Sequence, residues 1–255
     1  MMPTLFEPAH PGRTSPIRVL MLPAAYAEPS DFVQHGFARA VRERSLEVDL
    51  VFTGFHLQEV NDGRVFTRLR DEILLPAAAL GCAVWLGGIS LGGYLALGYA
   101  ERHQGELAGL CLFAPYLGSY LVTSEIERAQ GLESWQPGEF PEDDDERRVW
   151  RFIRTLRAGS LPVHLGLGRE DRFGRRHGLM ASALAPDSVD VVPGGHDWPT
   201  WRRLWDRFLD ARLAPKPAPP SNRSLISLPA RRQPALAAEF RPWIPSRPDP
   251  GAPRR

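Results

Sequence analysis

Gly88-Ile89-Ser90-Leu91-Gly92-Gly93 is the stretch of this 255-residue sequence that decides its fold. The apolar residues 82–86 just before it predict a buried strand, and residues 91–100 predict a helix. Ser90 therefore stands on the corner between a strand and a helix. So tight a corner strains its backbone and is tolerable because the flanking glycines leave room. We expect the serine hydroxyl to stand above the sheet edge, where the free N–H groups of the helix N-terminus also point.

Strands and helices alternate along the rest of the chain. Apolar runs predict strands at residues 17–22, 48–52, 107–113, 162–167 and 189–192. Helical spacing predicts helices near residues 30–44, 65–80, 146–156, 175–184 and 201–213, with Pro76 bending or restarting its helix. The alternation implies right-handed βαβ units, and therefore an α/β fold with a mainly parallel sheet and helices on both faces. Such sheets bind ligands at the carboxyl ends of their strands.

A serine hydroxyl needs a histidine to take its proton and an acid to orient that histidine. With its Gly-x-Ser-x-Gly turn, the sequence resembles the α/β-hydrolase family, in which this turn is the nucleophile elbow. In that family the nucleophile, acid and histidine follow in this order, each on a turn after a strand. Here Gly168-Arg169-Glu170-Asp171-Arg172-Phe173 and Pro193-Gly194-Gly195-His196-Asp197-Trp198 follow two predicted strands. The resemblance covers roughly residues 16–213 and implies an α/β-hydrolase fold.

His196 is the one histidine of seven in the position that the family implies for the base. Asp171 is the expected orienting acid, because the family motif places an aspartate just after this strand. Its rivals are Glu170 and Asp197. Asp197 adjoins the histidine, and neighbouring side chains in an extended turn point apart, so its alternative role is to cap the following helix. Surface or core roles are expected for His10, His35, His56, His103, His164 and His177, and His164, within a strand, is expected to have its hydrogen bonds satisfied.

The oxyanion that forms when Ser90 attacks a carbonyl needs hydrogen-bond donors. The backbone N–H of Leu91, at the start of the helix, supplies one. The family takes a second from the loop after an earlier strand, which implies Ala25 here, with Ala24 and Tyr26 as alternatives. This loop lacks the His-Gly-Gly-Gly run of the hormone-sensitive-lipase group.

Three segments depart from the alternation. Residues 1–15 are expected to be a loose leader. Residues 118–145 interrupt the alternation of strands and helices after a core strand. They are expected to form a small cap insertion beside the active site, with an ordinary surface loop as the alternative. Residues 214–255 are rich in proline and carry eight lysines and arginines against two acidic residues. We expect this tail to be mostly disordered, with contact to an acidic partner as a second possibility.

Composition narrows the class of protein. With 43% hydrophobic residues the chain can bury the core of one hydrolase domain, here residues 16–213, with appendages. The balance of 31 basic and 30 acidic residues gives no reason to expect nucleic acid or a membrane as partner. Cys82 and Cys111 lie in apolar runs and are expected to be buried free thiols. No secretory signal or long apolar span is present in the sequence, and we expect a soluble cytoplasmic protein.

Other chemistries lack their motifs. We find no phosphate-binding loop, no dinucleotide fingerprint and no Cys/His cluster with metal spacing, so we expect neither a metal nor a cofactor. The glycine-rich run at the elbow has no following lysine, which argues against phosphate binding. The series Trp198, Trp201, Trp205 and Phe208 is interpreted as core packing of the last helix.

The expected function is therefore that of a serine hydrolase, which cleaves a small-molecule carboxylic ester through an acyl intermediate on Ser90. A serine at the elbow disfavours the branches of the family that use a carboxylate, the dehalogenases and epoxide hydrolases, and the dienelactone hydrolases, which use a thiol. A thioesterase or an acyltransferase of the same fold remains an alternative. A second class is a binding module of this fold whose catalytic residues are idle.

Overall fold

The computed structural model describes residues 1–157, 159 and 161–214, and their strands form one seven-stranded sheet in the order β1-β3-β2-β4-β5-β6-β7. The strands are β1 (Thr4–Glu7), β2 (Ile17–Leu22), β3 (Val48–Thr53), β4 (Ala83–Ile89), β5 (Gly109–Phe113), β6 (Val163–Gly168) and β7 (Val189–Val192). From β3 to β7 all neighbours are parallel, and β1 runs antiparallel to β3 at one edge. The prediction of a mainly parallel sheet is confirmed.

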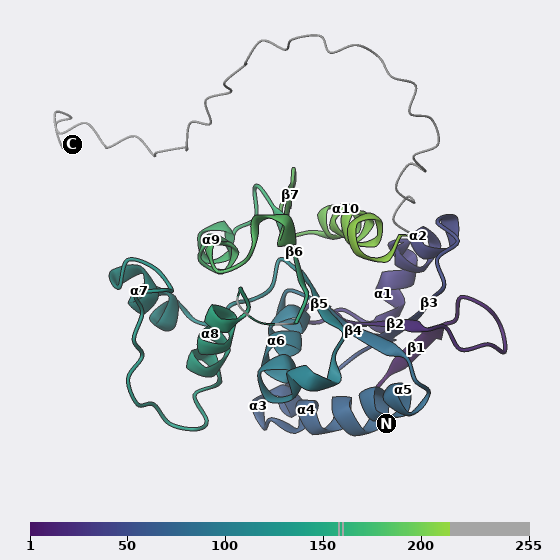
Figure 1. The fold of residues 1–255 in the computed structure, drawn as a ribbon, viewed down its shortest axis with the longest axis horizontal. Helices are drawn as coiled ribbons and strands as arrows, with labels where there is room; N and C mark the ends of the chain where they lie inside the picture. Colours follow the sequence, from purple (N-terminus) through teal and green to yellow (C-terminus); the bar gives the residue numbers. More distant parts are fainter. Residues whose placement is uncertain (158, 160, 215–255) are drawn as a thin grey trace, which may run out of the picture. The chain divides into compact units, whose positions relative to one another are not determined.

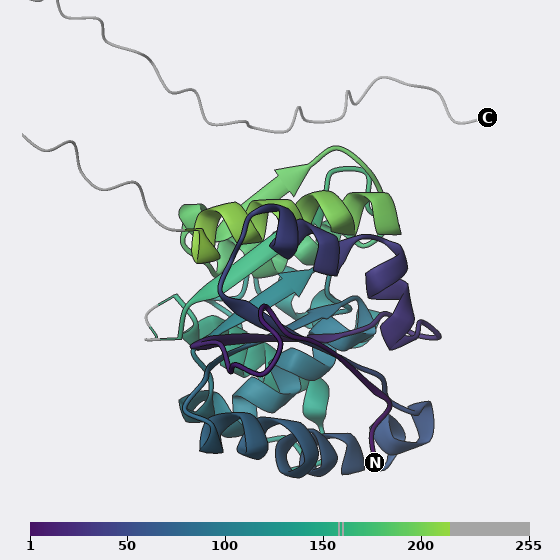
Figure 2. The same cartoon turned by 90° about the vertical axis from the view of Figure 1, so that its right-hand side faces the viewer.

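The helices connect these strands and lie on both faces of the sheet (Figure 1). The α-helices are α1 (Pro29–Gln34), α2 (Phe37–Glu43), α3 (Leu57–Asn61), α4 (Arg64–Leu69), α5 (Leu75–Ala79), α6 (Leu91–His103), α7 (Tyr120–Arg128), α8 (Asp145–Thr155), α9 (Gly174–Ser182) and α10 (Trp198–Phe208). Two 3₁₀ turns, η2 (Gln104–Glu106) and η3 (Pro186–Ser188), and two π-helical segments, η1 (Arg70–Leu74) and η4 (Leu209–Leu213), complete them. In Figure 2 the helices α1, α2 and α10 lie above the sheet and α3 to α6 lie below it.

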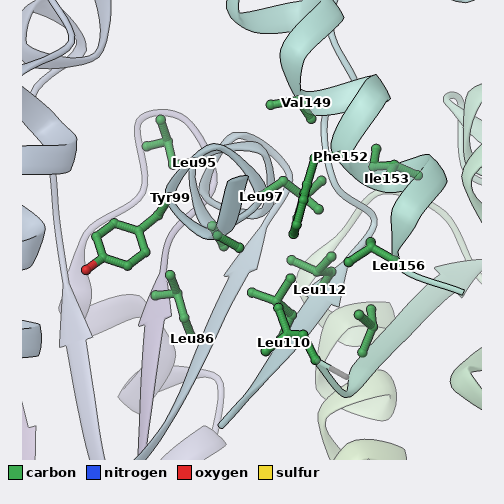
Figure 3. Close-up of a cluster of buried hydrophobic side chains, with 14 of the residues drawn as sticks. Leu86, Leu95, Leu97, Tyr99, Leu110, Leu112, Val149, Phe152, Ile153 and Leu156 are labelled. Carbon is green, nitrogen blue, oxygen red and sulfur yellow. The ribbon is translucent and has the colours of Figure 1, made fainter. Parts of the chain in front are cut away.

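Each face of the sheet has its own hydrophobic core, because successive residues of a strand point to opposite faces. In β5, Leu110 and Leu112 join the core beneath α6 and α8, where Phe152 and Ile153 meet them (Figure 3). Phe113 of the same strand joins the opposite core, in which Trp205 of α10 packs on it. A central strand covered on both sides in this way is almost wholly apolar, which is why its sequence alone identified it.

The structure differs from the sequence prediction at two helices. The helix expected at residues 30–44 is two helices, since Gly36 takes φ of +79° and ends α1 before α2 begins. The helix expected at residues 65–80 consists of α4, the π-helical η1 and α5. Pro76 lies in the first turn of α5, and Leu74 and Leu75 before it keep helical backbone angles, so the helix is not interrupted there. The π-helical segment η1 directly precedes the proline, as is common where a helix accommodates one.

The leader is also not loose. Within residues 1–15, β1 pairs with β3, and Met2 is buried. This strand is only four residues long and half exposed, and so its sequence carries little signal. Residues 118–145 contain α7 and pack by Ile126 and Trp135 on the core beneath α6 and α8. The tail predicted at residues 214–255 lies, but for Ala214, outside the described residues.

Both cysteines are free and buried, as the sequence predicted. Within the residues that the structure describes, no helix has the length and apolar character needed to cross a bilayer.

Candidate active site

Ser90 occupies the sharp turn between β4 and α6, and its backbone has φ of +51° and ψ of −114°. A serine in this sparsely populated region is strained, by about 1–3 kcal/mol. The turn is held by hydrogen bonds to the exit of β5: Ser90 N–H donates to the Phe113 carbonyl at 3.1 Å, and Tyr116 N–H donates to the Ser90 carbonyl at 2.8 Å. The strain is thus maintained by a neighbouring strand as well as by the turn itself.

The glycines on either side of Ser90 are required by close backbone contacts. A Cβ on Gly88 would lie 2.2 Å from the carbonyl carbon and oxygen of Gly92. A Cβ on Gly92 would lie 2.3 Å from the Leu22 carbonyl oxygen, and Gly92 N–H donates to the Pro23 carbonyl at 3.1 Å. The start of α6 therefore rests directly on the loop that follows β2. Both glycines have the role that the sequence predicted for them.

Ser90, His196 and Asp171 form a continuous chain of hydrogen bonds. The distance from His196 Nε2 to Ser90 Oγ is 2.9 Å, and that from His196 Nδ1 to Asp171 Oδ2 is 2.8 Å. The Asp171 side chain is completely buried and that of His196 is 8% exposed. Because an ionised carboxylate only accepts hydrogen bonds, Nδ1 carries the proton and donates it to Asp171, which leaves Nε2 to accept from the serine hydroxyl.

The Asp171 carboxylate is kept ionised by its hydrogen bonds. Burial alone would raise the pKa of Asp171, but hydrogen bonds from the His196 ring and from the backbone N–H of Phe173 outweigh burial and hold this pKa below its ordinary value. The Phe173 N–H donates to Oδ1 at 2.8 Å, so each carboxylate oxygen has a donor of its own. The acid is therefore fixed in both charge and orientation.

The two rival acids have other partners. Glu170 accepts a hydrogen bond from Gly194 N–H through Oε2, and Glu170 N–H donates to the Gly194 carbonyl at 3.0 Å. These bonds join the loop after β6 to the loop after β7. Asp197 caps α10, where its Oδ1 accepts from Thr200 N–H at 2.9 Å, as the sequence suggested. Neither carboxylate contacts the His196 ring through a hydrogen bond in the described residues.

The proposed oxyanion donors Leu91 and Ala25 belong to two segments that contact each other, the start of α6 and the loop after β2. Leu91 is the first residue of α6, so its N–H has no acceptor within the helix. Ala25 lies in the loop that α6 contacts through Gly92, and it shares a pocket with His196. Ala24, one of the alternatives, has its carbonyl bonded to Ala27 N–H at 3.1 Å, which makes this loop a turn.

Solved structures resemble this arrangement of strands and helices. One S-formylglutathione hydrolase, from Agrobacterium tumefaciens, matches with a TM-score of 0.57 at 15% identity, over 84% of this chain and 90% of its own. Another, from Staphylococcus aureus, matches at 0.53 and 11% identity over 78% and 82%. A feruloyl esterase module from Clostridium thermocellum matches at 0.50 and 17% identity over 79% and 77%. This chain has the α/β-hydrolase fold. No protein-family model and no curated protein matches its sequence.

Two aromatic side chains pack on the His196 ring, and the sequence did not predict this packing. Phe173, on the loop that carries Asp171, lies edge-to-face with the His196 ring, with ring centroids 5.0 Å apart. Trp201 of α10 lies perpendicular to the His196 ring, with centroids 5.1 Å apart. Of the series predicted to pack in the core, Trp201, Trp205 and Phe208 are buried as expected, whereas Trp198 is only partly buried against this core and also lines a pocket. Trp201 additionally contacts the His196 ring. Nothing in the local sequence of α10 distinguishes the two roles.

Two other histidines are buried in the structure. His177 of α9 contacts the Pro115 carbonyl through Nε2 at 3.1 Å and so ties α9 to the segment between Phe113 and Tyr116 that holds Ser90. His164 of β6 was expected to have its hydrogen bonds satisfied, and this was wrong: neither ring nitrogen has a hydrogen-bond partner among the described residues. The ring lies between Phe113 and Phe208, and burial lowers the pKa of His164 to about 4, so it stays neutral.

The described residues contain no group of three or more His, Cys, Asp and Glu side chains arranged to hold a metal ion.

Proposed function

We propose that this protein is a serine hydrolase that cleaves a carboxylic ester through an acyl intermediate on Ser90, with His196 as base and Asp171 as orienting acid. The observation that carries the proposal is the unbroken pair of hydrogen bonds at 2.8 and 2.9 Å that joins the three side chains. The strained conformation of Ser90 adds to it, since strain of this kind gathers at functional sites.

Acylation begins when the Ser90 oxygen attacks the ester carbonyl carbon while its proton passes to His196 Nε2. The carbonyl oxygen becomes an oxyanion and accepts hydrogen bonds from the backbone N–H groups of Leu91 and Ala25. The bond from carbon to the leaving oxygen then breaks, and that oxygen takes the proton from Nε2. The alcohol departs and the acyl group stays on Ser90. Throughout, the Asp171 carboxylate stabilises the imidazolium and holds its ring.

Deacylation repeats these steps with water. A water molecule gives its proton to His196 Nε2 and attacks the acyl carbon, and the same two N–H groups stabilise the second oxyanion. The bond to Ser90 breaks, its oxygen takes back the proton, and a carboxylic acid is released. No further reactant is required, because water supplies both the hydroxyl of the acid and the proton of the alcohol.

A thioester is the second candidate substrate. Two of the similar structures are named S-formylglutathione hydrolases, enzymes whose name denotes a thioester, whereas the third is a feruloyl esterase. The same attack serves both substrates, since only the leaving atom differs.

We also propose that residues 118–145 border the substrate: Gly118 follows two residues after Tyr116, and its carbonyl accepts from Arg176 of α9 at 3.0 Å. The two buried free thiols favour a reducing, cytoplasmic location.

The proposal is tested with p-nitrophenyl acetate and butyrate and with a fluorophosphonate probe. The wild-type protein should release p-nitrophenol and become labelled on Ser90. Ser90→Ala should abolish labelling and turnover with an unchanged circular dichroism spectrum. Ser182→Ala removes an exposed serine hydroxyl whose one hydrogen bond within the described part of the chain is to the Leu179 carbonyl, and it should leave both readouts unchanged. Folded wild-type protein that neither reacts with the probe nor hydrolyses any ester or thioester of a broad panel would refute the proposal.

A further inference from the structure

A pocket of about 540 Å³ adjoins His196 on the side of the loop that follows β2. Three parts of the chain line it: this loop, the helix α1, and the turn from β7 into α10. The lining residues are Ala24, Ala25, Tyr26, Ala27, Asp31, His35, His196, Asp197, Trp198, Pro199 and Trp201. The described part of the chain has larger depressions elsewhere, but those are lined by residues of other regions and lie away from the Ser90–His196 pair.

The chemistry of the proposed function determines which half of the substrate this pocket receives. His196 must return its proton to the leaving atom, so the leaving group has to lie on the His196 side of the carbonyl carbon. The carbonyl oxygen must at the same time point towards the N–H of Ala25. Both Ala25 and His196 line this pocket. This step rests on the proposed function.

Tyr26 borders this pocket. It is the third residue of the turn in which Ala27 N–H donates to the Ala24 carbonyl, and its φ of +64° is a value that several hydrogen-bonded turns require at this position. The residue is 90% exposed and follows Ala25, the proposed oxyanion donor. An exposed aromatic ring at the edge of a pocket is available to pack on a ligand bound there.

The acidic side chains that line the pocket are not matched by lysine or arginine. Its lining includes the carboxylates of Asp31 and Asp197 and no lysine or arginine. Hydrogen bonds from Thr200 lower the pKa of Asp197, which keeps that group ionised. Arg203 lies close enough to offset part of its charge, since it contacts Thr200 and the Pro193 carbonyl. Asp31 accepts a hydrogen bond from Glu28 N–H and has no cationic partner among the described residues.

The remaining wall is aromatic. The His35 ring stacks on Trp198 with centroids 4.5 Å apart and an angle of 8° between the planes, and Trp201 lies beyond them. Aromatic and alanine side chains favour apolar groups, and a nearby carboxylate favours cations and repels anions. We infer that this pocket is the leaving-group subsite, that Tyr26 packs on the bound group, and that the subsite takes apolar groups that are neutral or cationic and discriminates against anionic ones.

Three acetyl thioesters with different thiols test the charge preference. They are acetylthiocholine, which is cationic, its neutral isostere with 3,3-dimethylbutanethiol, and the anionic thioester of 2-mercaptoethanesulfonate. Each kcat/KM is divided by the rate constant for hydroxide hydrolysis of the same compound, which corrects for thiol acidity. One carboxylate at a distance of about 6 Å in water changes binding of a unit charge about threefold. The cationic thioester should therefore exceed the anionic one by about tenfold, with the neutral isostere between them.

Two variants assign this preference to the pocket. Asp31→Asn keeps the oxygen that Glu28 N–H requires, and it should raise kcat/KM of the anionic thioester about threefold while the neutral value stays the same. Asp71→Asn, on η1 and outside the pocket, should change kcat/KM of neither the anionic nor the neutral thioester. Tyr26→Ala should raise KM for the neutral isostere about fivefold or more, with a smaller effect on kcat and none on S-methyl thioacetate. Phe6→Ala removes another exposed aromatic side chain, on β1, and should leave these constants unchanged.

The outcomes separate the subsite from the proposed function. Turnover of all three thioesters without an order of charge, or with no response to Asp31→Asn and Tyr26→Ala, would overturn the subsite and leave the proposed function standing. A protein that turns over none of them and is not labelled at Ser90 would overturn the proposed function, and the subsite with it.

Discussion

Replacing Gly92 by alanine should damage catalysis far more than stability. The added Cβ would lie 2.3 Å from the Leu22 carbonyl oxygen and 2.5 Å from that of Pro23. Ordinary contact begins at 3.4 Å, so one of the two backbones must move by about 1 Å. On one side is the start of α6, with Ser90 and the Leu91 N–H. On the other is the loop that carries the Ala25 N–H.

The size of the effect follows from this displacement. Loss of one oxyanion donor reduces kcat by about 10²–10³-fold, and a misplacement of about 1 Å costs about 10²-fold. We therefore expect kcat of Gly92→Ala to fall at least about 100-fold. The free energy of unfolding should fall by about 1–3 kcal/mol, the usual cost of overpacking, partly offset because alanine favours a helix more than glycine does.

Steady-state hydrolysis of p-nitrophenyl acetate and urea unfolding measure the two effects. Gly98→Ala is the matched control: it lies on the same helix, and its Cβ would meet the ring of Phe66, a side chain that can yield. It should retain kcat within a factor of about three. If folded Gly92→Ala also retains wild-type kcat, then the contact between α6 and the β2 loop does not position the oxyanion donors, and the assignment of Ala25 fails.

Substitutions at three further residues have expected outcomes. Asp171→Asn should lower kcat by about 10³–10⁴-fold with little change in KM, because the His196 tautomer is no longer fixed; near-normal turnover would remove Asp171 from the mechanism. His164→Phe should flatten the loss of stability in acid. The folded pKa of about 4 lies below the unfolded value of 6.5, so unfolding takes up a proton and stability falls as the pH drops from about 6.5 to 4, by up to about 3 kcal/mol at full protonation. Urea titrations at pH 7 and 4.5 check this, and equal pH dependence of the two proteins would contradict it. His177→Leu leaves the Pro115 carbonyl without its donor and should lower the free energy of unfolding by about 1–3 kcal/mol, whereas His177→Gln, which can still donate, should cost less; equal losses would mean that packing alone matters.

Much of the fold could be predicted from the sequence because the central strands are covered on both faces. Such strands are nearly continuous apolar runs, and β4 ends at a motif whose glycines are required sterically. The order of Ser90, Asp171 and His196 after the strands β4, β6 and β7 was visible in the same way. Their proximity in space follows from the parallel sheet, which brings these exits to one edge.

What the sequence could not supply is information that arises only from tertiary contact. Backbone N–H groups are identical in every residue but proline, so Ala24, Ala25 and Tyr26 could not be separated from sequence. The packing of Phe173 and Trp201 on His196 joins separate loops and helices, and no periodicity encodes it.

The pairing of β1 with β3 has a consequence for the behaviour of the protein at high concentration. All six residues of β3 are buried, and without β1 its outer edge would present unpaired N–H and C=O groups beside an apolar strand. Such an edge is a template for strands of other molecules and a route to aggregation. The edge that β1 presents instead is short, half exposed and ends in Glu7, whose carboxylate pairs with Arg42. By covering the edge of β3, β1 therefore reduces the tendency of the sheet to pair with strands of other molecules.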